Sequence, residues 1–251
     1  MVKKRIMLTV AYDGTNYHGW QFQPGVKTIE GELNYYLSAL CKSEITVIGA
    51  SRTDTGVHAL GNIAVFDIDT SLVKIPPEKF AYALNQKLPE DIKIRNSKLV
   101  PDDFHPRKVP TVKTYRYQII NEEFPNPMER FYSHYTYVPL NHEVMQKAAI
   151  YLIGEHDFAS FCATGSTAET TVRRILDVNV RKEENKIIIE VKGNGFLYNM
   201  VRIIAGTLME VGKGKIEPEA VKEIIKARDR RKAGPTAPAR GLTVVGYDFS
   251  E

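Results

Sequence analysis

Apolar residues in the first part of the chain recur with two periods, one typical of strands and one typical of helices. Residues 5–13 alternate as a strand does, and Thr28 stands where a side chain would cap the next helix. Runs of β-branched residues predict the strands that follow. The predicted elements lie, in order, at residues 5–13, 29–40, 44–48, 62–66, 76–84 and 92–99. This order is β-α-β-β-α-β.

The second part of the chain repeats this order. An alternating strand opens it, Asn141 is placed to cap a helix, and Pro218 stands in the first turn of another helix. The predicted strands lie at 113–120, 175–181, 187–192 and 242–249, and helices are predicted after Asn141, from Phe196 and near Pro218. Both halves have the pattern of a split βαβ unit of the ferredoxin or RNA-recognition type, so the predicted fold class is α+β.

A boundary between two domains is predicted near residues 101–110, where proline, aspartate and lysine replace the periodic apolar residues. The N-terminal domain then covers residues 1–103 and the C-terminal domain residues 104–251. We expect two antiparallel sheets that flank a positively charged central cleft. Fold class alone says nothing definite about function.

Composition excludes several classes of protein. Apolar residues make up 43% and charged residues 25% of the chain, which indicates neither disorder nor a membrane class. The two cysteines, Cys41 and Cys162, lie far apart and in no paired-ligand pattern, so neither a disulfide framework nor a metal site is expected. A reducing, cytoplasmic location fits best. The net charge of +4 permits a polyanionic partner without requiring one.

The polar stretch 49–61 lies between two predicted strands and carries Arg52, Asp54 and His58. Loops held by a sheet at both ends often carry binding and catalytic residues. Asp54 stands two positions before a glycine, so it is either a turn residue or, kept ionised by Arg52, a usable carboxylate nucleophile. Arg52 also fits a purely structural pair with Asp54. Histidines so near a strand are more often structural, and His58 is predicted to be loop scaffolding.

Aromatic and cationic residues alternate in the strand that opens the second half. On such a strand Tyr115 and Tyr117 share one face and Arg116 takes the other. Interleaved aromatic and positive residues are typical of surfaces where bases stack and phosphates are neutralised. The alternative, a sheet core with a solvated arginine, is equally open at this point. The preceding Phe104-His-Pro-Arg107 adds further positive charge through Arg107.

The densest basic run is Arg228-Asp-Arg-Arg-Lys232, next to a segment rich in glycine and proline. Such runs are usually solvated faces, but this one is placed to extend a phosphate-binding surface with other cations: Arg107, Lys108, Lys113, Arg173 and Arg174. Arg202 lies among apolar helical positions, so it either borders the buried stripe or reaches into the cleft. No nucleotide cofactor is expected at Gly193-Asn-Gly-Phe-Leu-Tyr198, because Tyr198 stands where a dinucleotide site needs its third glycine.

Six motifs, in order along nearly the whole chain, resemble those of the TruA type of tRNA pseudouridine synthases. They are Tyr12-Asp-Gly-Thr-Asn-Tyr-His-Gly-Trp20, Ser51-Arg-Thr-Asp-Thr-Gly-Val-His-Ala59, Phe104-His-Pro-Arg107 with Lys113-Thr-Tyr-Arg-Tyr117, Gly154-Glu-His-Asp-Phe-Ala-Ser-Phe161, Gly195-Phe-Leu-Tyr-Asn-Met-Val-Arg202 and Thr236-Ala-Pro-Ala-Arg-Gly-Leu242. Two small departures, Ser51 for the usual glycine and Thr55 for the usual alanine, bear on local loop geometry more than on activity.

This resemblance implies an activity and roles for single residues. Asp54 would be the catalytic aspartate, and Tyr115 would stack on the target uracil. Arg52 would pair with Asp54 and help to hold the displaced nucleotide backbone, Arg202 would support the active-site cleft, and Arg107 is expected to bind substrate. Members of the family act as homodimers on the anticodon stem-loop of tRNA, where they convert the uridines at positions 38, 39 and 40 to pseudouridine without a cofactor.

Two other functions are compatible with the same residues. One is an RNA-binding or RNA-chaperone module in which the stretch around Asp54 is structural. The other is an aspartyl hydrolase that uses Asp54 or Asp67. Asp67 and Asp69 are however expected to lie on the solvent side of a strand end, because no glycine-rich or lysine-bearing stretch follows them.

Overall fold

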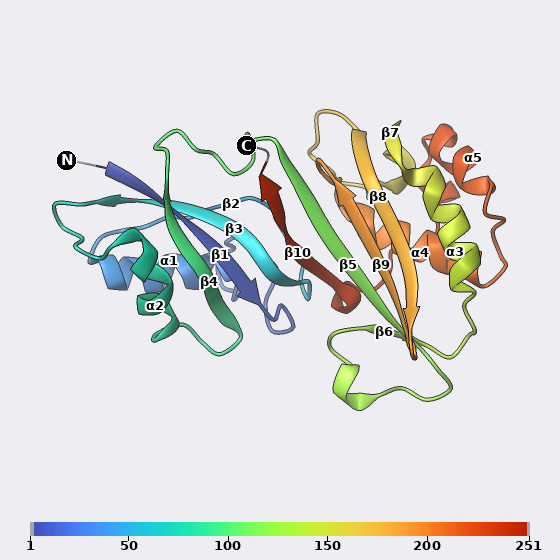
Figure 1. Cartoon of the computed structure of the whole chain (residues 1–251), viewed down its shortest axis with the longest axis horizontal. Coiled ribbons are helices and arrows are strands. Elements are labelled where there is room, and N and C mark those ends of the chain that lie inside the picture. The colour runs from blue at the N-terminus through green and yellow to red at the C-terminus, as the bar shows by residue number, and fades with distance from the viewer. Residues whose placement is uncertain (1–2, 250–251) are drawn as a thin grey trace. The chain divides into compact units, whose positions relative to one another are not determined.

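The computed structural model describes residues 3–249, and the chain divides into two compact units (Figure 1). We call residues 3–110 with 244–249 the N-terminal unit and Thr111–Thr243 the C-terminal unit. The predicted α+β class is confirmed, since both units combine helices with a sheet. Among the described residues, no helix has the length and apolar character that crossing a membrane requires.

The N-terminal unit is built on strands in the order β4-β1-β3-β10, and β2 also pairs with β3. Its strands are β1 (Lys3–Tyr12), β2 (Ile48–Gly49), β3 (His58–Asp69), β4 (Ile92–Val100) and β10 (Leu242–Phe249). The pairs β1–β3, β1–β4 and β2–β3 are antiparallel. The helices α1 (Ile29–Cys41) and α2 (Phe80–Asn85) contribute buried apolar side chains to its core: Ile29, Leu33, Leu37, Phe80 and Leu84.

The prediction of a strand over residues 44–48 is wrong for most of that segment, of which only Ile48 is in a strand. Ile45 N donates to Ser38 Oγ at 2.8 Å, and Val47 N donates to Asn34 Oδ1 at 2.9 Å. Both acceptors belong to α1, so these backbone groups bond to the helix and not to the sheet. Ile45 and Val47 are buried without strand pairing, whereas Thr46 between them is exposed.

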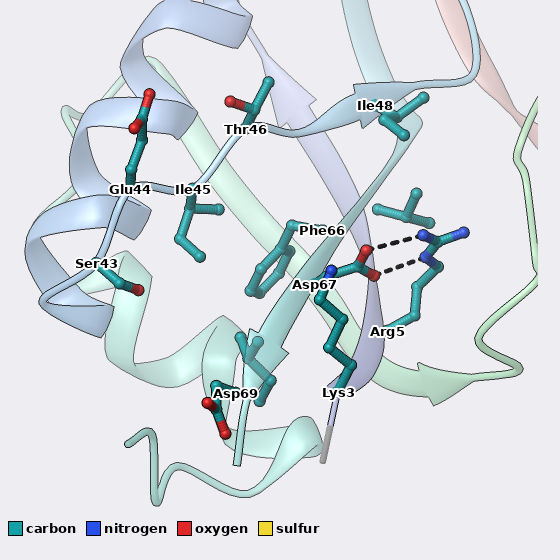
Figure 2. Close-up of a pocket in the computed structure, with 12 residues that line it drawn as sticks. Lys3, Arg5, Ser43, Glu44, Ile45, Thr46, Ile48, Phe66, Asp67 and Asp69 are labelled. Atoms are coloured by element: carbon teal, nitrogen blue, oxygen red, sulfur yellow. Dashed lines mark hydrogen bonds and ion pairs between the residues drawn. The ribbon is translucent and has the colours of Figure 1, made fainter. Parts of the chain in front are cut away.

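An ion pair between Arg5 and Asp67 joins β1 to β3, where the two residues stand directly opposite (Figure 2). Arg5 Nε lies 2.7 Å from Asp67 Oδ1 and Arg5 Nη2 lies 2.9 Å from Asp67 Oδ2, so the pair is bidentate. Hydrogen bonding by Arg5 lowers the pKa of Asp67 below its ordinary value. The pair lines a hollow of about 300 Å³, whose other walls include the segment that leaves α1. Asp67 is therefore part of a cross-strand clamp.

The C-terminal unit is built on strands in the order β5-β9-β8-β7, and β6 pairs with β5. Its strands are β5 (Thr111–Asn121), β6 (His134–Thr136), β7 (Gly154–Asp157), β8 (Val172–Glu183) and β9 (Lys186–Gly193). The short β6 and β7 are absent from the sequence prediction. The helices are α3 (His142–Ala149), α4 (Met200–Gly212) and α5 (Ala220–Ala227). α3 packs against β8 and α4, and α5 lies next to β7 (Figure 1).

Two helices, α1 and α3, start at their predicted caps, Thr28 and Asn141, and α4 starts later than predicted. Asn141 caps α3 as predicted, because its side chain accepts from two backbone N–H groups of the first turn. The helix predicted from Phe196 begins only at Met200, because Asn199 at its N-cap has a φ of 58° in the left-handed region.

The last strand, β10, has the predicted bounds but differs in its grouping. Residues 244–249 belong with the N-terminal unit, whereas the sequence pattern assigned them to a domain over 104–251. Tyr247 and Phe249 pack against a buried cluster of the N-terminal unit: Met7, Ala50, Ile63, Val65 and Val100. Residues 244–249 thus belong to the N-terminal unit because their apolar side chains pack against residues that are distant in the sequence.

Replacing Asp67 by asparagine should lower the free energy of unfolding at pH 7 by up to about 1 kcal/mol, since the pair is partly exposed. The pKa of Asp67 is lowered in the folded chain, so its stabilisation is present above the ordinary value of 3.8 and is lost as pH falls through the folded pKa. Urea unfolding at pH 7 and at pH 3 should therefore show the two proteins converging in acid. The exposed Asp248→Asn is the control; an equal loss for both variants would contradict the clamp.

Candidate active site

Asp54 lies on the loop between β2 and β3, which is shorter than predicted because β3 begins earlier in the sequence. Ala50 N donates to Ile63 O at 2.7 Å, so the loop leaves the sheet at a fixed point. Val57 N donates to Asp54 O at 3.1 Å and closes a tight turn before the strand. Asp54 itself is half-buried. A carboxylate is thereby held on a short loop that is closed at both ends.

Residues 12–20, which we call the bracing segment, place their backbone against this loop. Trp20 N donates to Thr53 O at 3.0 Å. A β-carbon on Gly14 or on Gly19 would overlap a carbonyl oxygen of the loop, so only glycine permits the approach. Gly19 also has a φ of +81°, which other residues rarely adopt. The position of the loop thus depends on two glycines outside it.

Side chains of the bracing segment add to this contact. The hydroxyls of Tyr12 and Thr53 lie 2.8 Å apart. The indole of Trp20 is 1% exposed and packs against Gly49, where any β-carbon would overlap the ring. The sequence indicates no role for the single residues of this stretch. It does contain a recognisable feature, because two glycines and the protein's single tryptophan lie close together directly after a strand.

His58 is buried at the start of β3, and its ring faces the bracing segment. Its Nδ1 lies 3.1 Å from Gly14 N and 3.2 Å from Asp13 Oδ1. Both contacts hold the imidazole ring against the backbone and side chain at the start of the bracing segment. The predicted role of His58 as loop scaffolding fits these contacts.

The two arginines predicted to bind substrate in this unit differ in their contacts. Arg52 is exposed. Its pairing with Asp54 stays a prediction. Arg107 Nε donates to Gly49 O at 2.8 Å, so Arg107 fixes the backbone just before the loop. A further role of Arg107 in binding substrate also stays a prediction.

Tyr115 in the C-terminal unit is 8% exposed, and its ring meets Phe196 edge to face with a centroid distance of 4.8 Å. Tyr117, on the same face of β5, is fully buried and donates through its hydroxyl to Pro238 O at 2.9 Å. Arg116 takes the other face, where it pairs with Glu190 of β9 at 2.9 Å. The predicted alternation of faces is confirmed.

Two arginines hold the segment at residues 233–240, next to α4. Arg202 Nε donates to Ala237 O at 2.7 Å, and Ala237 N returns a bond of 3.1 Å to Arg202 O. Arg230 donates to Gly234 O at 2.9 Å. Arg202 is half-buried among the buried apolar residues of its helix, and whether it also reaches into a cleft stays a prediction. The segment is fixed by side chains despite its glycine and proline content.

The sequence of the chain matches the family model described as tRNA pseudouridine synthase over residues 8–107 and 148–250. The chain belongs to this family. The matched ranges contain the Asp54 loop, the bracing segment and Arg202, whereas Tyr115 lies between them.

Curated relatives of the chain carry the name tRNA pseudouridine synthase A. One from Thermoanaerobacter sp. (strain X514) is 49% identical over 242 residues, covering 96% of this chain and 98% of the relative. One from Ruminiclostridium cellulolyticum is 51% identical over 243 residues, with coverage of 96% and 98%. One from Halalkalibacterium halodurans is 46% identical over 240 residues, with coverage of 95% and 90%.

The basic run at 228–232 of this pseudouridine synthase family member makes contacts within its own unit. Arg228 lies 3.0 Å from an Asp157 oxygen. Arg231 binds Asp229 at 2.8 Å and holds the pKa of that carboxyl down to about 2. Much of the charge in the run is therefore compensated locally. Its role in binding RNA stays a prediction.

Replacing Gly14 by alanine should lower the free energy of unfolding by about 1–3 kcal/mol, because the new methyl group would overlap Val57 O and force the loop away. Gly246→Ala is the matched control, since no atom lies within 4 Å of its added β-carbon. Urea unfolding of both variants measures the difference. Equal stabilities would show that the backbone contact does not constrain the loop.

Proposed function

We propose that this chain isomerises uridine to pseudouridine in tRNA and that the Asp54 carboxylate carries the chemistry. The observation that supports it most is the fixed loop: in a member of the tRNA pseudouridine synthase family, the bracing segment holds a half-buried aspartate in one position. Fixed geometry is what a single catalytic group needs to act on one bond of a large substrate.

The reaction requires no net oxidation or reduction. The N1–C1′ bond of the uridine breaks, the base turns within the site, and a C5–C1′ bond forms. The proton that C5 loses is balanced by the proton that N1 gains. Attack on C1′, addition to the uracil ring and removal of a sugar proton each use an ionised carboxylate such as that of Asp54. This chemistry does without a cofactor or a metal.

The target base must leave its stack before a protein group reaches it, which costs a few kcal/mol. An aromatic ring that stacks on the displaced uracil offsets this cost, and Tyr115 is the residue assigned to it. Its ring is held in place by Phe196, so little motion is lost on binding. Arg52 then helps to hold the displaced backbone, Arg107 binds substrate and Arg202 supports the active-site cleft.

The finer features of this proposal have separate sources. The anticodon stem-loop with its positions 38, 39 and 40 and the homodimer rest on family resemblance. The cytoplasmic location rests on the cysteine content, and the positively charged cleft between two split βαβ halves rests on the pattern of the sequence. The strand order β4-β1-β3, with β2 beside β3, supports a split βαβ arrangement of the N-terminal unit.

The Asp54→Asn variant should lose pseudouridine formation by at least about 10³-fold, because the amide cannot replace the ionised carboxylate. Binding of tRNA should remain, since the shape of the side chain is kept. Carbodiimide adducts read by primer extension measure the product, and filter binding measures the affinity.

Asp69→Asn, at the far end of β3, is the matched control and should keep its activity. Continued modification by Asp54→Asn would remove Asp54 from the chemistry. Tight tRNA binding by the wild-type chain without any pseudouridine would favour an RNA-binding module over an isomerase.

Arg52→Ala should weaken tRNA binding and reduce the slope of log affinity against log salt by about 1, as expected for one lost phosphate contact. Arg52 is suited to this contact because its side chain is exposed. Affinity titrations at several salt concentrations give the slope. Lys87→Ala removes another exposed cation of the same unit and should leave the slope unchanged; an equal fall in both slopes would speak against a specific contact.

A further inference from the structure

Asn62 is a polar residue in an otherwise apolar stretch of β3, and its side chain is completely buried. Burying an amide is costly unless its hydrogen-bonding groups find partners. Ile63, Ala64, Val65 and Phe66 follow it and are all buried and apolar. An apolar residue such as leucine or valine would fit this buried position of the strand better, so the presence of a polar amide here needs a specific reason.

The hydrogen bonds of Asn62 fix the orientation of its amide. Nδ2 donates to Ser51 O at 3.1 Å and to the Tyr12 hydroxyl at 3.4 Å. Oδ1 accepts from Ile63 N at 2.9 Å and from the Tyr247 hydroxyl at 2.8 Å. A carbonyl oxygen only accepts and a backbone N–H only donates, so a flipped amide would lose the bonds to both Ser51 and Ile63.

Two of the hydrogen bonds of Asn62 connect it to the Asp54 loop. Ser51 O is part of the loop backbone, three positions before Asp54. The Tyr12 hydroxyl also contacts Thr53 Oγ1 at 2.8 Å, directly beside Asp54 in sequence. Asn62 is therefore bonded to the loop once directly and once through Tyr12.

Tyr247 supplies the other end of this chain of hydrogen bonds. It lies 185 positions from Asn62 in sequence, on β10. Its ring stacks on Phe249 with an interplanar angle of 20°, and both rings pack against the buried cluster that includes Ala50 and Ile63. Packing thus holds the ring independently of the hydroxyl, whose bond orients Asn62.

We propose that Asn62 and Tyr247 are positioning residues for Asp54. Tyr247 orients the Asn62 amide, and the amide holds the Ser51 carbonyl and, through Tyr12, the Thr53 side chain. This assignment rests on the proposed function of Asp54 in pseudouridine formation. Misplacing a catalytic group by about 1 Å costs up to about 100-fold in rate, so loss of one bond in this chain should reduce turnover and not the binding of tRNA.

The test is Tyr247→Phe in the full chain, assayed with a tRNA transcript that carries tritium at uridine C5, from which isomerisation releases the label. We expect kcat to fall by about tenfold with KM unchanged. Tyr135→Phe is the control: this half-buried tyrosine of the other unit donates through its hydroxyl to Glu123 O at 2.6 Å, and kcat of the variant should remain within about twofold.

Two further measurements separate positioning from general stability. If Asn62 and Tyr247 act in one chain, Asn62→Ala with Tyr247→Phe should lose no more activity than the more severe single variant. Amide hydrogen exchange of residues 51–57 in the free protein should rise in Tyr247→Phe and stay unchanged in the control.

The outcomes distinguish this proposal from the proposed function. Unchanged kcat and unchanged exchange in Tyr247→Phe, or additive losses in the double variant, would overturn the positioning role while the isomerase assignment stands. A wild-type chain that releases no tritium would overturn the isomerase assignment, and the exchange measurement would then decide the positioning of the loop by itself. Tyr247→Phe keeps the test decisive even if Asn62→Ala fails to fold, since it removes only one hydroxyl.

Discussion

The backbone of the Asp54 loop touches the backbone of the bracing segment with no side chain between them, and the N-terminal unit is arranged around this contact. Gly14 and Gly19 make the approach possible, and Trp20 N bonds to the loop at its centre. Glycine loses more conformational entropy on folding than other residues, so two glycines here destabilise the folded chain, but they allow the two backbones to touch. The loop is then held by backbone contacts, which have fewer degrees of freedom than contacts between side chains.

This contact and several hydrogen bonds hold the loop firmly against the N-terminal unit. Its entry is fixed by the bond from Ala50 to Ile63, by Arg107 on Gly49 O and by Asn62 on Ser51 O. A polar loop next to a buried strand normally needs water to satisfy its backbone groups, whereas here several partners come from the protein. A carboxylate on such a loop keeps its place without substrate, which is the preorganisation that catalysis by a single group requires.

Two arginines of the C-terminal unit donate to backbone carbonyl oxygens, as Arg107 does in the N-terminal unit. Arg202 and Arg230 fix the backbone at Ala237 and Gly234, and the Tyr117 hydroxyl fixes Pro238. Each of these bonds replaces water on a carbonyl and removes flexibility from a segment whose composition suggests a mobile linker. Positive charge counted from the sequence therefore overstates the charge that is free to meet phosphates, because part of it serves the fold.

Sequence reasoning succeeded where structure is decided locally and failed where distant residues decide it. Thr28 and Asn141 cap their helices as predicted, since a cap depends on the next few residues alone. Residues 44–47 were misjudged because their N–H groups bond to side chains of α1, and nothing in a β-branched run reveals such partners. The same limit applies to the site. Asp54 stands out in the sequence by its charge. The link between Asn62 and Tyr247 is visible only in the structure, where β10 and β3 belong to the same unit. A chain of hydrogen bonds between residues so far apart in the sequence leaves no local sequence pattern.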